Sequence, residues 1–174
     1  MESIRVWKLS SCCAVAAALT LLNSASDTTA QEPQLSLEED YAYPFANEIL
    51  AQTNIELIRG DGHLLLVDCN KPHSEEIGHI RIQTSDVTVG TDGLFCLEMS
   101  ETASSGYLAL EVHQVYEIRN DGRNLGLGHA LTVQWEVDNA SESGEVPRGG
   151  TLQIGSGADP SSGAATLLEL RARR

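Results

Sequence analysis

The segment 55–69 reads Ile55-Glu56-Leu57-Ile58-Arg59-Gly60-Asp61-Gly62-His63-Leu64-Leu65-Leu66-Val67-Asp68-Cys69. Two apolar runs flank an Asp-Gly step. Because Asp tolerates a left-handed backbone and Gly has no Cβ, the step predicts a tight turn between two antiparallel strands. The second run is apolar at four successive positions, so we expect it to be covered on both faces. The segment therefore predicts a β-hairpin.

The same kind of pattern recurs along the rest of the chain. Short apolar alternations are separated by turn residues, including Asp-Gly steps at 92–93 and 121–122, and no long helical periodicity follows Leu50. The expected strands cover 78–83, 87–89, 94–99, 107–118, 125–137, 151–154 and 166–171, whereas 139–150 is expected to be a polar loop. About eight or nine strands at this spacing predict an all-β fold, and an antiparallel β-sandwich is favoured.

One of these strands carries a long alternating run. The residues expected on its inward face are Leu125, Leu127, His129, Leu131, Val133, Trp135 and Val137. Gly126 and Gly128 lie between them and indicate a bulge or a bend.

Composition narrows the classes of partner. The chain has 174 residues and a formal net charge of −14. Nucleic-acid affinity comes largely from Lys and Arg that neutralise phosphates, so this balance argues against nucleic acid as a partner. The same repulsion weakens binding to anionic lipid surfaces.

The first thirty residues have the layout of a secretory signal peptide. Arg5 and Lys8 precede an apolar run at 12–22, and small and polar residues follow. Cleavage is expected after Ala30, with Ser26 as the competing site. A signal anchor is the alternative, but the run is shorter than the roughly 20 residues of a spanning helix. We therefore expect a secreted, extracellular protein with no transmembrane segment after cleavage.

The domain organisation follows from these boundaries. Residues 1–30 are the signal peptide, 31–43 an acidic flexible linker, and 44–174 the β-sandwich domain. A short helix is expected within 41–52. Pro44 suits its first position, and Phe45, Ile49 and Leu50 share a face that would pack against one end of the sheet.

Two cysteines remain after signal cleavage, Cys69 and Cys96. In an exported domain such a pair is expected to form a disulfide bond. In a regular strand Cys96 lies on the opposite face from Phe95 and Leu97. The bond must therefore lie on the outer side of the sheet, unless a bulge rotates the cysteine. A reactive thiol is the alternative, but the carboxylates Asp92 and Glu98 nearby disfavour a thiolate.

The sequence contains no motif that places catalytic or metal-ligating residues together. The five histidines, which are His63, His73, His79, His113 and His129, form no HxH or HExxH pair, and no CxxC occurs. His113 is expected to be exposed beside Glu111, and His129 to cap the edge of the core. No metal, cofactor or catalytic residue is predicted. A hydrolase whose residues are scattered in sequence stays open.

Two short stretches are candidates for interaction. The segment from Asn70 to Gly78 is expected to form a loop stiffened by Pro72, and its first residues Asn70, Lys71, Pro72 and His73 are the candidate contact residues. Arg59-Gly60-Asp61 spells an integrin-type adhesion tripeptide at the expected turn. Turn chemistry alone also accounts for that tripeptide.

Three phrases carry a resemblance to known sequences. They are residues 59–69, the run Ser105-Gly106-Tyr107-Leu108-Ala109-Leu110-Glu111, and the ending Ala165-Thr166-Leu167-Leu168-Glu169-Leu170. Together they resemble small, functionally unassigned exported proteins of actinobacteria, over about residues 44–171. The resemblance implies export and a compact β-domain. It carries over no catalytic residue.

These observations favour a non-catalytic binding protein of the extracellular space or cell envelope. Its partner would be a protein or an envelope component, met by loops or by an exposed sheet face. A small secreted hydrolase and an inhibitor of a secreted enzyme are the alternatives. The sequence predicts neither the ligand nor the oligomeric state.

Overall fold

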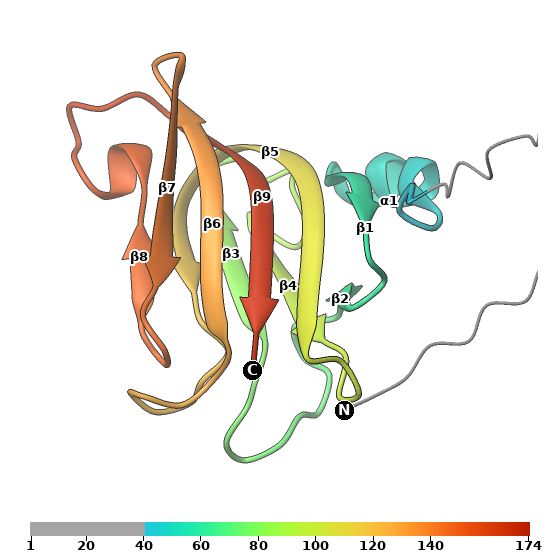
Figure 1. Ribbon diagram of the computed structural model, residues 1–174. Coiled ribbons are helices and arrows are strands. Elements are labelled where there is room, and N and C mark those ends of the chain that lie inside the picture. Colours follow the sequence, from blue (N-terminus) through green and yellow to red (C-terminus); the bar gives the residue numbers. More distant parts are fainter. Residues whose placement is uncertain (1–40) are drawn as a thin grey trace, which may run out of the picture. The chain divides into compact units, whose positions relative to one another are not determined.

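The computed structural model describes residues 41–174, which form one short helix and an antiparallel sheet of nine strands (Figure 1). The mostly-β prediction is therefore confirmed. The elements are α1 (Ala46–Thr53), β1 (Glu56–Gly60), β2 (Leu64–Val67), β3 (Ile80–Thr84), β4 (Leu94–Met99), β5 (Ser105–Arg119), β6 (Ala130–Val137), β7 (Ala140–Val146), β8 (Thr151–Gln153), a 3₁₀ turn at Gly155–Gly157, and β9 (Ala165–Arg173). The strand order is β2-β4-β3-β5-β9-β6-β7, and β1 and β8 also pair with β5.

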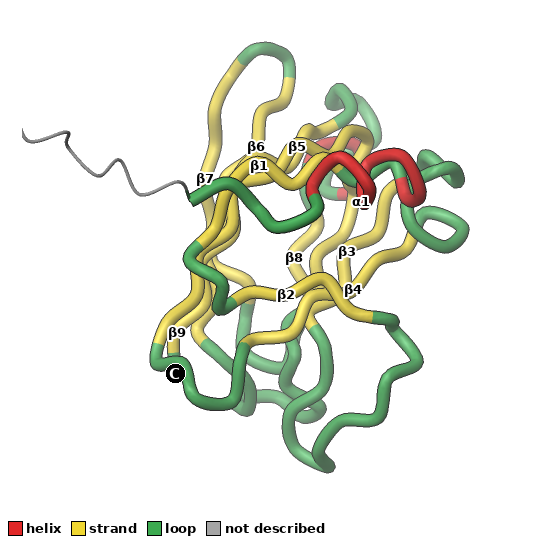
Figure 2. The backbone as a smooth tube through the Cα atoms, turned by 90° about the vertical axis from the view of Figure 1, so that its right-hand side faces the viewer, coloured by secondary structure: helices red, strands yellow, loops and turns green. Residues whose placement is uncertain are grey.

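Strand β5 organises the sheet because it changes neighbours halfway along. Residues 105–115 pair with β9 and 108–111 with β1, whereas 115–119 pair with β3 and 117–119 with β8. The change occurs at Gln114, which has a φ of 58° and interrupts the register. In Figure 1 β5 arches between the two groups, and in Figure 2 β1 and β9 lie apart from β3 and β8.

Hydrogen bonds from β3 and the residue after it fill the interruption in β5. The Ser85 amide donates to the Gln114 carbonyl oxygen at 3.0 Å. The Thr84 hydroxyl donates to the His113 carbonyl oxygen at 2.8 Å. Because backbone groups freed by a bulge need partners when they are buried, these bonds stabilise the bend.

The core is built from alternate residues of the long strands. Leu108, Leu110 and Val112 of β5 are buried, as are Leu131, Val133 and Trp135 of β6. This alternation is the pattern that the sequence predicted for both strands. The largest fully buried side chains are Ile55, Leu64, Ile80, Ile82, Leu97, Leu108, Leu110, Ile118, Leu131, Ile154, Leu167 and Leu170.

The predicted hairpin at 55–69 is wrong. Strand β1 pairs with β5 and β2 pairs with β4, so the two consecutive strands have different partners. The Asp61-Gly62 step does turn the chain, with Gly62 at a φ of 77°, but it directs the chain towards a different part of the sheet. The run at 64–67 is also not covered on both faces, since Leu64 is buried while Leu65 is exposed.

The polar loop predicted at 139–150 is instead largely a strand. Residues Ala140–Val146 form β7, which pairs with β6 across a two-residue turn at Asp138 and Asn139. Both turn residues have positive φ values, of 51° and 65°, as a tight hairpin requires. In β7 every residue except Gly144 and Val146 is exposed, which explains why its sequence shows no apolar alternation.

Two further boundaries differ from the prediction. Residues 87–89 form a turn, because Asp86 Oδ1 accepts hydrogen bonds from the amide and hydroxyl of Thr88. Strand β6 begins only at Ala130, and Leu125 lies in the preceding loop with 84% of its surface exposed. The alternation seen before residue 130 therefore belongs to a loop.

The predicted short helix is present as α1. Its N-cap is Phe45, which has a φ of 58° and is exposed, and only Ile49 of the expected apolar face packs against the core. The last three residues of the predicted linker 31–43 pair with β1, since Tyr43 donates to the Ile58 carbonyl oxygen at 3.2 Å. The predicted signal peptide and the rest of the linker lie outside the described residues. Within 41–174 no helix combines the length and apolarity needed to cross a membrane.

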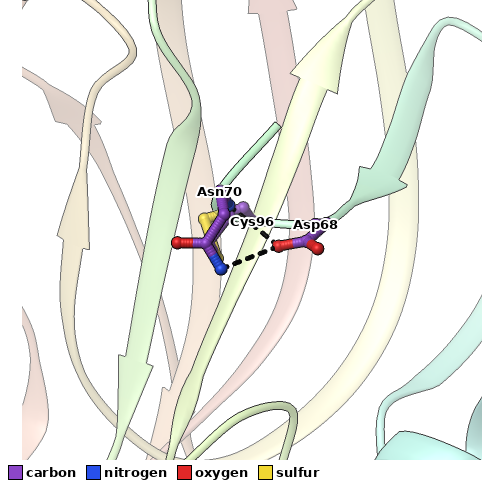
Figure 3. Close-up of a disulfide and its surroundings, with 4 residues drawn as sticks. Asp68, Asn70 and Cys96 are labelled. Atoms are coloured by element: carbon purple, nitrogen blue, oxygen red, sulfur yellow. Dashed lines mark hydrogen bonds between the residues drawn. A yellow bond between two sulfur atoms is a disulfide. The ribbon is translucent and has the colours of Figure 1, made fainter. Parts of the chain in front are cut away.

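The predicted disulfide joins Cys69 and Cys96, whose Cα atoms are 5.2 Å apart (Figure 3). The pairing of β4 with β2 and β3 is regular, so Cys96 faces away from Phe95 and Leu97, on the side that carries exposed Arg81. The bond therefore lies on the outer side of the sheet. Cys96 is nevertheless buried, because the segment that carries Cys69 lies over it.

The core predicts one clear contrast in stability. Ile82 is fully buried, so Ile82→Ala is expected to lower the free energy of unfolding by about 2–5 kcal/mol through lost burial and a residual cavity. Leu125→Ala, at an exposed loop position, is the control and is expected to change stability by less than about 0.5 kcal/mol. Urea denaturation measures both values. Equal effects of the two substitutions would contradict the burial described here.

Candidate functional site

Two adjoining cavities lie at one end of the sheet. The connection between β2 and β3, the connection between β5 and β6, and the C-terminus all reach this end, which is the lower end in Figure 1. The larger cavity, which we call the histidine groove, has a volume of about 740 Å³ and is lined by Lys71, Pro72, His73, Ser74, Ile77, Gly78, Glu98, Met99, Glu101, Asp121, His129 and Arg174.

The smaller cavity shares His73, Gly78 and Asp121 with the histidine groove. We call it the arginine pocket. Its volume is about 330 Å³, and it is lined by His73, Gly78, His79, Arg81, Arg119, Asn120, Asp121, Gly122 and Arg123. Segments far apart in the chain, 73–81 and 119–123, therefore form its walls.

A buried carboxylate holds a histidine at the groove. Asp121 is only 3% exposed, and its Oδ2 lies 2.5 Å from His129 Nδ1. Its Oδ1 accepts the backbone N–H of the same residue at 2.9 Å. Since a carboxylate oxygen accepts, His129 Nδ1 is the donor of this bond, and Nε2 takes no part in it. This arrangement can orient a general base, and it also closes the loop that carries it.

Asn120 completes the frame of this loop. Its Oδ1 accepts the N–H groups of Gly122 at 2.9 Å and Gly149 at 3.1 Å, and its Nδ2 donates to the His129 carbonyl oxygen at 2.9 Å. A Cβ on Gly122 would lie 2.0 Å from the Leu127 carbonyl oxygen, so only glycine fits. The loop between β5 and β6 is thus held in one shape around Asp121.

The β2–β3 connection is attached to that loop by backbone bonds. Gly78 donates to the Asp121 carbonyl oxygen at 2.6 Å, and Arg123 donates to the Glu76 carbonyl oxygen at 3.1 Å. The walls of both cavities therefore belong to one hydrogen-bonded framework.

Two histidine rings contact each other edge to face where the cavities meet. The rings of His73 and His79 are 4.9 Å apart and nearly perpendicular. His79 is 6% exposed, and within residues 41–174 its Nε2 has no hydrogen-bond partner. Burial is the main cause that lowers the pKa of His79 below its ordinary value, and the neighbouring His73 lowers it further. His79 is therefore neutral at neutral pH.

The polar side chains around the groove are mostly engaged. Ser74 Oγ donates to the Ile77 carbonyl oxygen at 3.0 Å and accepts the Ile77 N–H at 2.9 Å. Lys71 Nζ lies 2.5 Å from Glu98 Oε2, and the Arg174 guanidinium donates to the Glu101 carbonyl oxygen. The groove serine is thus held in a turn by its own hydroxyl, and among the described residues no hydrogen bond reaches His129 Nε2.

The predicted contact residues lie partly at this site. Lys71, Pro72 and His73 line the histidine groove, whereas Asn70 lies with the disulfide beside a separate groove on the outer face of the sheet. The Asn70 amide and side-chain nitrogen both donate to Asp68 Oδ1, at 2.8 and 3.1 Å (Figure 3). These bonds shape the start of the connection, directly after Cys69.

The adhesion tripeptide lies elsewhere. Arg59 and Gly60 belong to β1, and the Gly60 amide donates to the Tyr41 carbonyl oxygen at 3.0 Å. Asp61 Oδ1 accepts the His63 amide at 3.0 Å. The arginine and glycine of the tripeptide thus lie within the sheet and not at a hairpin tip.

Sequence reasoning missed the residues that give the site its chemistry. Asp121 was expected to be a turn residue and His129 a core-edge histidine, and Arg81, Arg119 and Arg123 were not considered. The available signal was an Asn-Asp-Gly step followed eight residues after the Asp by a His, because that spacing allows a closed loop. Within the described range no group of three or more His, Cys, Asp or Glu is arranged to hold a metal ion.

Comparison with known proteins assigns no family: no protein-family model matches the chain, and no curated protein matches it. The resemblance to small exported actinobacterial proteins stays a prediction. The function is therefore inferred from the geometry alone.

The buried histidine predicts a dependence of stability on pH. Because the pKa of His79 is lower in the folded protein, the unfolded chain takes up more protons below about pH 6.5. The free energy of unfolding is therefore expected to fall as the pH is lowered from 7.5 to 5.5. His79→Gln should reduce this slope, and the control His63→Gln, at an exposed position, should keep it. Identical slopes in urea titrations of all three proteins would contradict the prediction.

Proposed function

We propose that this protein is an exported binding module that holds its partner at the end formed by the histidine groove and the arginine pocket. The observation that carries the proposal is that both cavities are preformed. Much of their walls comes from two connections that are joined by backbone bonds, and the Asn120, Asp121 and His129 network holds the β5–β6 connection in shape. Sites of this kind bind with little loss of conformational entropy.

Export is supported by the disulfide between Cys69 and Cys96. Such bonds persist in oxidising compartments outside the cytosol. The basic and apolar pattern of residues 1–30 supports the same location. We therefore propose a secreted, extracellular protein whose partner is a protein or a cell-envelope component.

We also infer that the bent sheet packs on itself as a β-sandwich. Each half of β5 has its own neighbours, β1 and β9 for the first half and β3 and β8 for the second. Figure 2 shows these groups on different sides of the interior. One cluster of buried side chains draws on both groups, which supports a shared core between two layers.

A capture experiment tests the binding function. The oxidised full chain is immobilised and exposed to the envelope and culture filtrate of the producing organism. We expect one partner to be retained by the wild type and lost from the double variant Lys71→Ala, His73→Ala, because both residues line the groove. The matched control, Ser141→Ala with Glu142→Ala, lies in the hairpin at the opposite end and should retain the partner.

The captured partner is then bound to purified variants by calorimetry. Equal affinity of the wild type and the groove variant would contradict a binding site at this end, and so would retention by a reduced, unfolded sample. If the partner is an enzyme whose activity falls on binding, the binding function takes the form of inhibition.

A small secreted hydrolase is the second candidate, favoured by the contact between Asp121 and His129 in the groove. In this candidate His129 Nε2 accepts the proton of an attacking water, and Asp121 keeps the imidazole oriented. The wild type should then hydrolyse a member of an ester and phosphoester panel. His129→Asn should lower the rate about 100-fold or more, and His63→Asn should not. No turnover by the folded wild type would eliminate this candidate.

A further inference from the structure

We propose that the arginine pocket binds a tetrahedral oxyanion, a phosphate or sulfate group, of the ligand held by this protein. The inference rests on the proposed binding function and names the chemistry that the ligand presents. The pocket combines Arg81, Arg119 and Arg123 with His73 and His79 in about 330 Å³. Three of the eight arginines in residues 41–174 thus meet in one small cavity.

Two of these arginines lie directly opposite one another. Arg81 of β3 and Arg119 of β5 are register partners in an antiparallel pair, so their side chains leave the same face of the sheet as neighbours. Like charges in this position destabilise a sheet. On the neighbouring strands Cys96 lies opposite Arg81 and Thr151 lies opposite Arg119. Neither residue carries a negative charge that would compensate the arginines.

The carboxylates nearby are engaged with other groups. Asp121 lines the pocket, but its two oxygens accept from His129. Glu117 shares a face with Arg119, and its Oε1 accepts from Gln83 Nε2 at 2.8 Å. Glu98, next to the pocket, pairs with Lys71. Within residues 41–174 none of the three arginines has a carboxylate within ion-pair distance.

Two histidines line the same pocket. Arg123 Nη2 lies 3.1 Å from Nδ1 and 3.2 Å from Nε2 of His73. Beneath His73 lies buried His79, whose Nε2 has no partner in the described part of the chain. A buried polar atom without a partner is uncommon, and it marks a place where the protein alone leaves the hydrogen bonding incomplete. The three guanidinium groups without an ion-pair partner among the described residues therefore favour an external anion as their acceptor.

The surroundings favour a small group over a polymer of charges. The chain carries a net charge of −14, so a polyanion is repelled by most of the surface, while one oxyanion reaches a local positive site. Guanidinium groups present paired N–H donors that match phosphate and sulfate oxygens. We therefore assign a single phosphate or sulfate group as the complement of the pocket.

Calorimetry with inorganic sulfate and inorganic phosphate is the direct test. Sulfate is included because its charge is constant between pH 5.5 and 7.5, where histidines and phosphate both titrate. The full chain should bind either ion saturably at constant ionic strength. Arg81→Gln and Arg119→Gln should each weaken binding at least tenfold, because each removes a charge-assisted contact. Arg59→Gln removes an equivalent charge outside the pocket and should leave the affinity unchanged.

Vesicles distinguish a free anion from a lipid headgroup. Phosphatidylglycerol vesicles are compared with phosphatidylcholine vesicles by sedimentation. Sedimentation with the anionic vesicles, abolished by Arg119→Gln, supports the pocket with a lipid-borne phosphate. Binding of the inorganic ions without sedimentation supports it with a soluble ligand.

The melting temperature distinguishes an anion-binding arginine from one that only stabilises the fold. Without added anion, Arg119→Gln should raise the melting temperature, because it relieves the repulsion with Arg81. Added sulfate should stabilise the wild type more than this variant, and their difference removes the general effect of sulfate on folding. If the variant does not fold, Arg81→Gln takes its place.

Three results would overturn the inference: no saturable binding of either ion by the folded wild type, equal binding by the pocket variants and Arg59→Gln, or a lower melting temperature for both pocket variants. If the groove still captures its partner in that case, the binding function stands and only the oxyanion is wrong. If capture fails as well, both fail.

Discussion

The bend in β5 is the constraint on which the rest of the structure depends. A strand of fifteen residues pairs with four others, and it does so because Gln114 adopts a positive φ and releases the register. Directly after Arg119, the last residue of β5, come Asn120 and Asp121, which line the arginine pocket. The strand that changes neighbours within the sheet is thus also the strand that leads into the site.

The two cavities separate two kinds of polar chemistry within a short distance. On one side both oxygens of a buried carboxylate accept hydrogen bonds from one residue, His129. On the other side three guanidinium groups are uncompensated by any described carboxylate within ion-pair distance. Asp121 lines both cavities but serves only the first. Three arginines outnumber that one carboxylate in the lining, so the arginine pocket is positive although the chain as a whole is strongly acidic.

The sequence pattern predicted the strands that have one buried face, but it did not predict which strands pair with each other. The alternation of β4, β5 and the second half of the β6 region was predicted, since those strands have one inward face. Strand β7 was missed because it is almost wholly exposed. The hairpin at 55–69 was wrong because an Asp-Gly step specifies a turn but not which strands pair after it. The site residues were missed for the same reason: Arg81 and Arg119 meet only through the register of β3 with β5.

The disulfide lies at the start of an exposed segment whose side chains can change without affecting the core. Cys69 fixes the start of the β2–β3 connection to β4, and β3 fixes its end at Ile80. Between these points residues 71–76 are exposed and contribute little to the core. A segment that is attached to the sheet at both ends in this way can accept new side chains without a change in the strands on either side of it. Substitutions in this segment would therefore change the surface at this end of the sheet and leave the scaffold unchanged.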